Sequence, residues 1–332
     1  MAKREKRACP TANNRVGGQA VLEGVMMKHK DFCATAVRCP DKTIAVDKRQ
    51  VKSIKDKCFL FRLPIIRGVV NFVETLRLSM STLTLSAELQ GIEEEKSEFE
   101  KKLEKKLGKS IMGIAAVIGG ILGVVVALAM FFYLPMLVSK FVSLFVDMNF
   151  VLKAIVEGVS KFSIFLLYVW AVAFMPDIRR TYEYHGAEHK SIFCHEQGLP
   201  LTVENVKKQS RFHPRCGTSL MFVMLLIGML VSMCLPATLW DNLFVRFLVK
   251  LLILPLVVGV GYEFTIFAGT HDNFVLRILT APGLWFQRLT TREPDARQIE
   301  VAIVALKSAM PHVYPEESVF DNIENKKDEG EL

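Results

Sequence analysis

The chain lacks the motifs by which many soluble enzymes and secreted proteins are recognised. Its 332 residues contain no C-x-x-C pair, no phosphate-binding G-K-[ST] loop, no dinucleotide fingerprint and no internal repeat. The cysteine count of seven is odd, which argues against a disulfide framework and for reduced thiols in a cytosol-facing protein. Residues 1–15 are basic and polar without an apolar core, so a secretory signal peptide is not expected.

Long uncharged runs are what the chain has instead. Its mean hydropathy is +0.29, and 51% of its residues are hydrophobic while 23% are charged. This mixture predicts a membrane domain joined to sizeable polar segments. The net charge of +8 is explained by basic flanks of membrane helices, so the lipid bilayer is the expected partner and nucleic acid is not.

Four segments are apolar enough to predict membrane spans. The first is an uncharged run of 28 residues, and the second is weakened by Lys153 and Glu157 in its extension through 151–160. The four predicted spans are 111–138, 162–175, 218–235 and 251–269. The expected fold is therefore a mainly α integral membrane protein with four transmembrane helices, and α+β overall.

The distribution of Lys and Arg predicts the orientation. Residues 1–110 carry 23 of them and the loop 177–216 carries seven, whereas residues 139–161 carry three and residues 236–243 none. This places both basic regions and both termini in the cytoplasm of a bacterial cell, with the spans in its cytoplasmic membrane. Arg246 and Lys250 oppose this orientation and must snorkel or pair.

The polar segments divide the chain further. Residues 16–58 predict a small β-rich subdomain with a hairpin around Pro40-Asp41-Lys42. Residues 59–90 predict an amphipathic interfacial helix, with a fifth span as the alternative, because Arg67, Asn71 and Glu74 share a narrow stripe. The remaining divisions are a basic arm (1–15), a charged linker (91–110), a four-span domain (111–271) with a cytoplasmic loop (177–216), interfacial and C-terminal helices (272–312) and a disordered acidic tail (313–332).

Two features are expected after the last span. Pro282-Gly283 interrupts an apolar segment, which suggests two half-helices at the interface. Glu293-Pro294-Asp295 then opens a short helix, with Pro294 suited to its first turn.

The segment Y-H-G-A-E-H-K (184–190) carries the strongest chemical signal. His185 and His189 stand four residues apart, so on a helix both imidazoles project from one face and can share a metal ion. Glu188 completes the H-x-x-E-H arrangement of inverzincins, in which the glutamate activates the attacking water. The competing interpretation is a helix whose histidines bond neighbouring backbone groups.

A second segment, F-H-P-R-C-G-T-S (212–219), precedes the third span. His213 and Cys216 are both of types that bind zinc, and His271 follows the fourth span. The predicted topology brings these residues to one cytoplasmic face, where zinc or another divalent transition metal is the expected cofactor. A helix-start residue for His213 and a small buried side chain for Cys216 are the alternatives.

Three further residues are candidates for binding or function. Glu263 is an acid inside the fourth span, although a salt bridge to Arg67 or Arg277 would explain it equally well. Gln19 and Glu23 lie in the glycine-bounded segment G-G-Q-A-V-L-E-G-V-M-M (17–27), where they could contact substrate. A glycine-bounded edge strand with Glu23 in a salt bridge is the structural alternative.

Taken in order, these motifs resemble the YqhQ-like family of bacterial membrane proteins, which are labelled as metal-dependent enzymes. The resemblance spans roughly residues 16–300 and rests on the segments 17–27, Arg67-Gly68, 184–190 and 213–219. It implies a metal site at His185, His189, His213 and Cys216, and it supplies no reaction.

We expect a zinc-dependent hydrolase that acts at the cytoplasmic membrane face on a membrane peptide or lipid, with Glu188 as general base. The alternative is a non-catalytic membrane adaptor or assembly factor, with a structural metal site or none, that docks a membrane-protein partner. A transporter using Glu263 is the weakest interpretation, because the predicted spans carry few acids and show no repeat.

Overall fold

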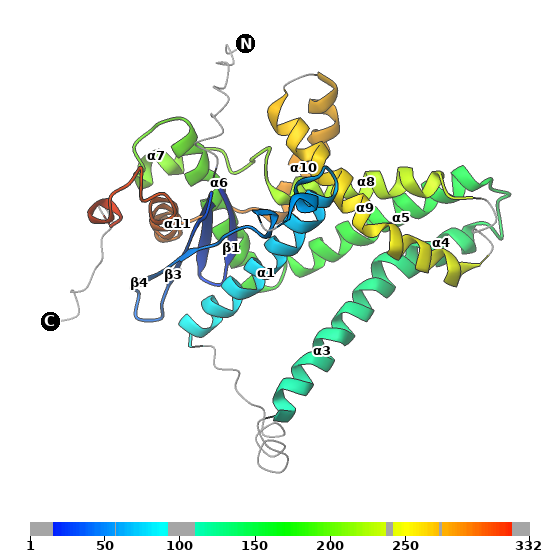
Figure 1. The fold of residues 1–332 in the computed structure, drawn as a ribbon, viewed down its shortest axis with the longest axis horizontal. Coiled ribbons are helices and arrows are strands. Elements are labelled where there is room, and N and C mark those ends of the chain that lie inside the picture. The colour runs from blue at the N-terminus through cyan, green and yellow to red at the C-terminus, as the bar shows by residue number, and fades with distance from the viewer. Residues whose placement is uncertain (1–15, 57, 92–109, 237–241, 272–273, 321–332) are drawn as a thin grey trace.

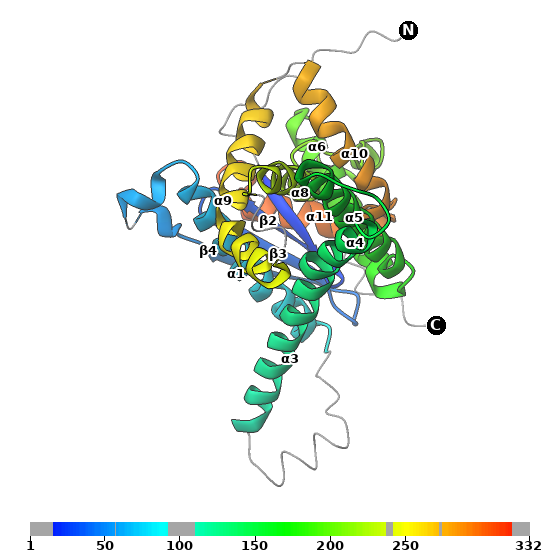
Figure 2. The same cartoon turned by 90° about the vertical axis from the view of Figure 1, so that its right-hand side faces the viewer.

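The computed structural model describes residues 16–56, 58–91, 110–236, 242–271 and 274–320. The protein is mainly helical, with a small sheet near its N-terminus, as the sequence predicts (Figure 1; Figure 2 gives the view turned by 90°). The main helices are α1 (Ile66–Leu89), α3 (Ser110–Leu128), α4 (Leu134–Val142), α5 (Phe150–Val172), α6 (Pro176–Glu196), α7 (Val203–Lys207), α8 (Gly217–Met233), α9 (Leu243–Thr270), α10 (Phe274–Thr290) and α11 (Ala296–Ala309). The predicted basic arm, nearly all of the charged linker and the end of the acidic tail lie outside the described residues.

The sheet is an antiparallel meander in the order β1-β2-β3-β4. Its strands are β1 (Gly17–Val21), β2 (Gly24–His29), β3 (Phe32–Arg38) and β4 (Ile44–Gln50). The β3–β4 turn contains Pro40-Asp41-Lys42, where the Asp41 carboxylate accepts bonds from the backbone and hydroxyl of Thr43. The predicted β-rich element and its hairpin are therefore confirmed.

Both faces of this sheet are covered, which explains why its hydrophobic alternation is imperfect. On one face Val25, Met27 and Ala34 join a core with α6 and α11. On the other face Met26 and Val37 join a core with α1. A strand buried on both faces needs apolar residues at consecutive positions, as in β2.

Apolar helices form the other half of the molecule and indicate a membrane protein. Ile118–Val142 and Leu243–Ala268 are each long and apolar enough to cross a bilayer. A third span exists if α5 and α6 are counted together, although they meet at a bend of 101°. The apolar stretch of α8, Met221–Met233, is shorter than a full crossing. The count of four spans therefore stays a prediction.

α1 is amphipathic. Its polar stripe is fully engaged: Arg67 pairs with Glu263, Asn71 accepts from Lys55, and Glu74 accepts from Ser53. Apolar side chains on the same helix remain exposed, including Val73, Leu76 and Met80. Such a helix needs an apolar surface outside the chain.

α10 differs from the expected pair of half-helices. It is one helix from Phe274 to Thr290, with Pro282 inside it. An internal proline removes one backbone hydrogen bond and can bend a helix without ending it, and here α10 continues while packed along α8. Pro294 also lies one residue before the Asp295 N-cap of α11, and not in the first turn.

Candidate metal centre

α6 is a polar helix that is buried in its second half. Every residue from Gly186 to His195 is buried, because the sheet, α11 and the segment before α8 surround it. Gly186 is required by this packing, since a Cβ there would collide with the carbonyl oxygen of Arg292, whose backbone crosses the helix and bonds to Tyr182. Gly186 thus allows the backbone at Arg292 to pass close to α6, directly after His185.

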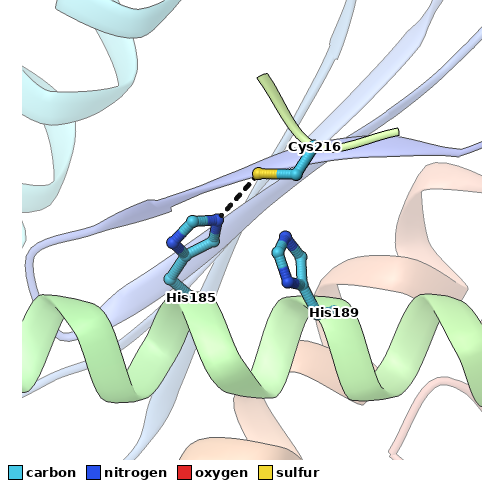
Figure 3. Close-up of side chains that lie close together, drawn as sticks. All are labelled: His185, His189 and Cys216. Carbon is cyan, nitrogen blue, oxygen red and sulfur yellow. Dashed lines mark hydrogen bonds between the residues drawn. The ribbon is translucent and has the colours of Figure 1, made fainter. Parts of the chain in front are cut away.

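Three predicted ligands meet at this place. One ligand atom each from His185, His189 and Cys216 lies within 4.8 Å of the others, and Nε2 of His185 is 3.3 Å from Cys216 Sγ (Figure 3). Both imidazoles rise from one face of α6, as the four-residue spacing predicts. Cys216 comes from the turn before α8, which is closed by a backbone bond from Cys216 to His213.

Backbone carbonyls orient both imidazoles. Nδ1 of His185 lies 2.9 Å from the carbonyl oxygen of Thr290, and Nδ1 of His189 bonds to that of Arg211. A carbonyl can only accept, so both Nδ1 atoms carry a proton, and in the neutral form of each ring the Nε2 lone pair can bind a metal ion. Burial lowers the pKa of His189, which favours the neutral, metal-binding ring. This arrangement is typical of metal-binding histidines.

Glu188 lies on the same buried helix. Burial raises its pKa to about 8. Strand β1 passes closely over its carboxylate: a Cβ on Gly18 would lie 2.9 Å from Oε1 of Glu188. A Cβ on the adjacent Gly17 would meet nothing within 4 Å. Gly18 therefore makes room for this carboxylate.

His213, the fourth predicted ligand, is outside the three-residue cluster. Its ring centroid is 5.7 Å from that of His189, and its Nε2 faces Glu196 at 3.5 Å. Its Nδ1 accepts a bond from the backbone of Arg215, whose side chain also pairs with Glu196. The geometry therefore brings Cys216, and not His213, to the two α6 histidines.

The remaining candidates lie elsewhere. Glu263 pairs with Arg67, which is the salt bridge that the sequence offered as an alternative. Gln19 bonds to Ser79 and Thr82 and so links β1 to α1. His271 is exposed at the end of α9, where its ring stacks on Phe267.

Glu23 also belongs to a different place. Its carboxylate pairs with Arg180 and accepts a bond from the Tyr184 hydroxyl. The salt bridge expected for the glycine-bounded segment is therefore present. Glu23 therefore contacts α6 through Arg180 and Tyr184, whose side chains leave the helix in other directions than those of His185 and His189.

Several groups that hold the centre were not found from the sequence. Gln287 of α10 bonds to both the N–H and the carbonyl of His213, each at 2.8 Å. Glu196 binds Arg215 and faces His213. The sequence did offer a signal for Gln287, because an amide side chain within an apolar helix is unusual. The roles of Thr290 and Arg211 could not be predicted, because their backbone carbonyls make the contacts and these do not depend on the side chain.

Comparison with known proteins agrees with the motifs. Residues 63–312 match the family described as "Protein of unknown function (DUF1385)". The chain is 34% identical over 288 residues to the "Uncharacterized protein YqhQ" of Bacillus subtilis (strain 168). The aligned region covers 86% of this chain and 89% of that protein. No solved structure matches the chain. The chain therefore belongs to the YqhQ-like DUF1385 family.

Proposed function

We propose that this protein is a zinc-dependent hydrolase of the bacterial cytoplasmic membrane, acting at its cytoplasmic face on a membrane peptide or a lipid. The observation that carries the proposal is the orientation of His185 and His189 toward Cys216. Two imidazoles and one thiol whose ligand atoms lie within 4.8 Å of one another form a ligand set that suits zinc. Three protein ligands leave a fourth position for water, as catalytic zinc sites require.

The chemistry would be activation of that water. A zinc ion held by His185, His189 and Cys216 would supply this activation, because zinc lowers the pKa of a water that it binds toward about 7. Glu188 would take the water's proton and pass it to the leaving group. Its raised pKa means that the carboxyl holds a proton in the metal-free protein at pH 7. The added positive charge of the ion favours the carboxylate, which is the form that a base needs.

The membrane setting rests on charge and on exposed apolar surface. The basic segments 1–110 and 177–216 belong on the cytoplasmic side in a four-span topology with both termini inside. The exposed apolar residues of α1 then lie in the inner leaflet. In this arrangement the polar α6 leaves the bilayer at its 101° bend with α5.

The test is the metal content of detergent-purified protein. The wild type should hold about one zinc per chain, and His189→Ala should lose it. His195→Ala is the matched control: it removes a buried histidine of the same helix that bonds Tyr314, and it should keep the metal. Negligible metal in all three proteins would refute the proposal.

A structural metal site in an adaptor or assembly factor is the second candidate. The burial of His189 and Glu188 favours it, because closed sites exclude water. Substituting Glu188→Gln separates the two candidates. A hydrolase should lose its cellular function with its zinc still bound, whereas an adaptor should keep both.

A further inference from the structure

A polar cavity of about 290 Å³ lies where the sheet, α1, α6 and α11 converge. It is distinct from the histidine cluster. Arg180 and Tyr184 of α6 line it, and the helical twist turns their side chains roughly 100–180° away from those of His185 and His189. Its floor includes the turn at Glu23 and the β3–β4 turn with Lys42.

The lining of this cavity is rich in cations. Four cationic and two acidic side chains face it, which leaves a formal excess of two positive charges; they are Arg38, Lys42, Arg180 and Arg297 against Glu23 and Asp295. Glu300, which pairs with Arg38 from outside the lining, reduces the excess to one.

The acids of the lining are already engaged. Glu23 binds Arg180 and the Tyr184 hydroxyl, and Asp295 caps α11 by accepting from the backbone of Gln298. In contrast, no ion pair to Lys42 or Arg297 occurs in the described part of the chain. Two cations thus face the cavity without a carboxylate committed to them.

One guanidinium is also held in place in advance. Arg38 donates to the carbonyl oxygens of Lys42 and Arg297 and to Glu300, and its side chain is only 14% exposed. These bonds connect the β3–β4 turn, which carries Lys42, to the start of α11, which carries Arg297. The backbone positions of these two cations are therefore held relative to each other. Such preorganisation reduces the entropy lost when a ligand binds.

We propose that this cavity binds a phosphate-bearing anion. Guanidinium and ammonium groups are the side chains that recognise phosphate, through charge-assisted hydrogen bonds. The site is independent of the proposed zinc chemistry. Its ligand is either a soluble phosphorylated molecule or the headgroup of an anionic lipid.

Binding is tested with inorganic pyrophosphate on the full-length, detergent-purified protein by titration calorimetry. EDTA is present throughout, so that no metal at the histidine cluster can hold the probe. A second arm measures the thermal stabilisation of the same protein by vesicles of phosphatidylglycerol, with phosphatidylcholine as the neutral reference. The two arms distinguish a soluble source of phosphate from a lipid source.

The decisive variant is the double substitution Lys42→Gln with Arg297→Gln. Its control, Lys48→Gln with Arg179→Gln, makes the same change of net charge at two exposed residues that do not line the cavity. Removing two charge-assisted bonds should weaken pyrophosphate binding about tenfold or more, and the control should bind within about twofold of wild type. All four substituted side chains are at the surface, and equal melting temperatures will verify folding.

Each outcome decides the question. Saturable pyrophosphate binding that weakens only in the lining variant supports the site and a soluble ligand. Stabilisation by phosphatidylglycerol alone, lost only in that variant, supports the site and a lipid ligand. Absence of both effects, or equal weakening in both double variants, overturns the proposal.

Discussion

Glu188 carries a carboxyl group that the fold shields from water. It is almost fully buried, at 4% exposure, and β1 closes over it at Gly18. A carboxyl in such a place keeps its proton, since burial disfavours the charged form. Two consequences of this burial can be measured: the pH dependence of stability that comes from the Glu188 carboxyl, and the effect of filling the space at Gly18.

The first consequence is a pH dependence of stability. The pKa of Glu188 is about 8 in the folded protein and 4.5 as its reference value, so the folded state binds this proton more tightly. Stability from this group is complete at low pH and is lost as pH rises toward 8, by up to about 1.4 kcal/mol per pH unit. We expect metal-free wild type to lose melting temperature between pH 6 and pH 8, and Glu188→Gln to lose less. Parallel pH profiles of the two proteins would contradict this.

The second consequence concerns space. In Gly18→Ala the new Cβ would lie 2.8 Å from the Met26 carbonyl and 2.9 Å from the Glu188 carboxylate. Overpacking of this kind destabilises by about 1–3 kcal/mol, so the melting temperature should fall by several degrees. Gly17→Ala is the control, because its Cβ would meet nothing within 4 Å. Equal melting temperatures for the two variants would contradict this prediction, because β1 would then accommodate the new methyl group at position 18 without loss of stability.

Among the elements, α1 and α9 cross at close range. Gly68 and Gly259 face each other there, and a Cβ on Gly68 would lie 3.0 Å from the Cα of Gly259. The Arg67–Glu263 pair flanks this crossing. The crossing fixes α1, and through Gln19 it also fixes β1. The position of the sheet over the apolar helices therefore depends on two small residues.

Gly259→Ala should loosen this crossing, because its Cβ would lie 2.6 Å from the carbonyl oxygen of Ile65. We expect a loss of about 1–3 kcal/mol, read as a lower melting temperature in detergent. Gly228→Ala, in α8, is the matched control, since its nearest neighbour would be Val257 at 3.9 Å, an ordinary contact. A larger loss in Gly228→Ala than in Gly259→Ala would refute the assignment.

At the scale of the whole molecule, the membrane orientation can be read by cysteine labelling. Cys234 is exposed just after α8, and the predicted topology puts it at the outer end of the third span. A variant that keeps Cys234 alone should react with a membrane-impermeant maleimide in intact cells. A cysteine-free variant carrying Lys208→Cys should react only after the cells are opened. The reverse pattern would invert the topology.

The sequence predicted those features that depend on residues close to one another in the chain. The spacing of His185 and His189 placed both rings on one helix face, and the turn residues at Pro40-Asp41-Lys42 located a hairpin. It could not choose between His213 and Cys216, because that choice depends on how the turn before α8 meets α6. Helix continuity through Pro282 likewise depends on packing, which a single sequence does not record.

Strand β1 and the turn after it touch both places where small ligands are proposed to bind. Gly18 rests against the Glu188 carboxylate, and Glu23 anchors Arg180 at the cationic cavity. β1 ends at Val21, and Glu23 lies in the tight turn that joins β1 to β2, so only a short segment of chain links the two positions. A substitution in this short segment therefore has to be checked for effects at both sites, although each site has its own set of binding residues.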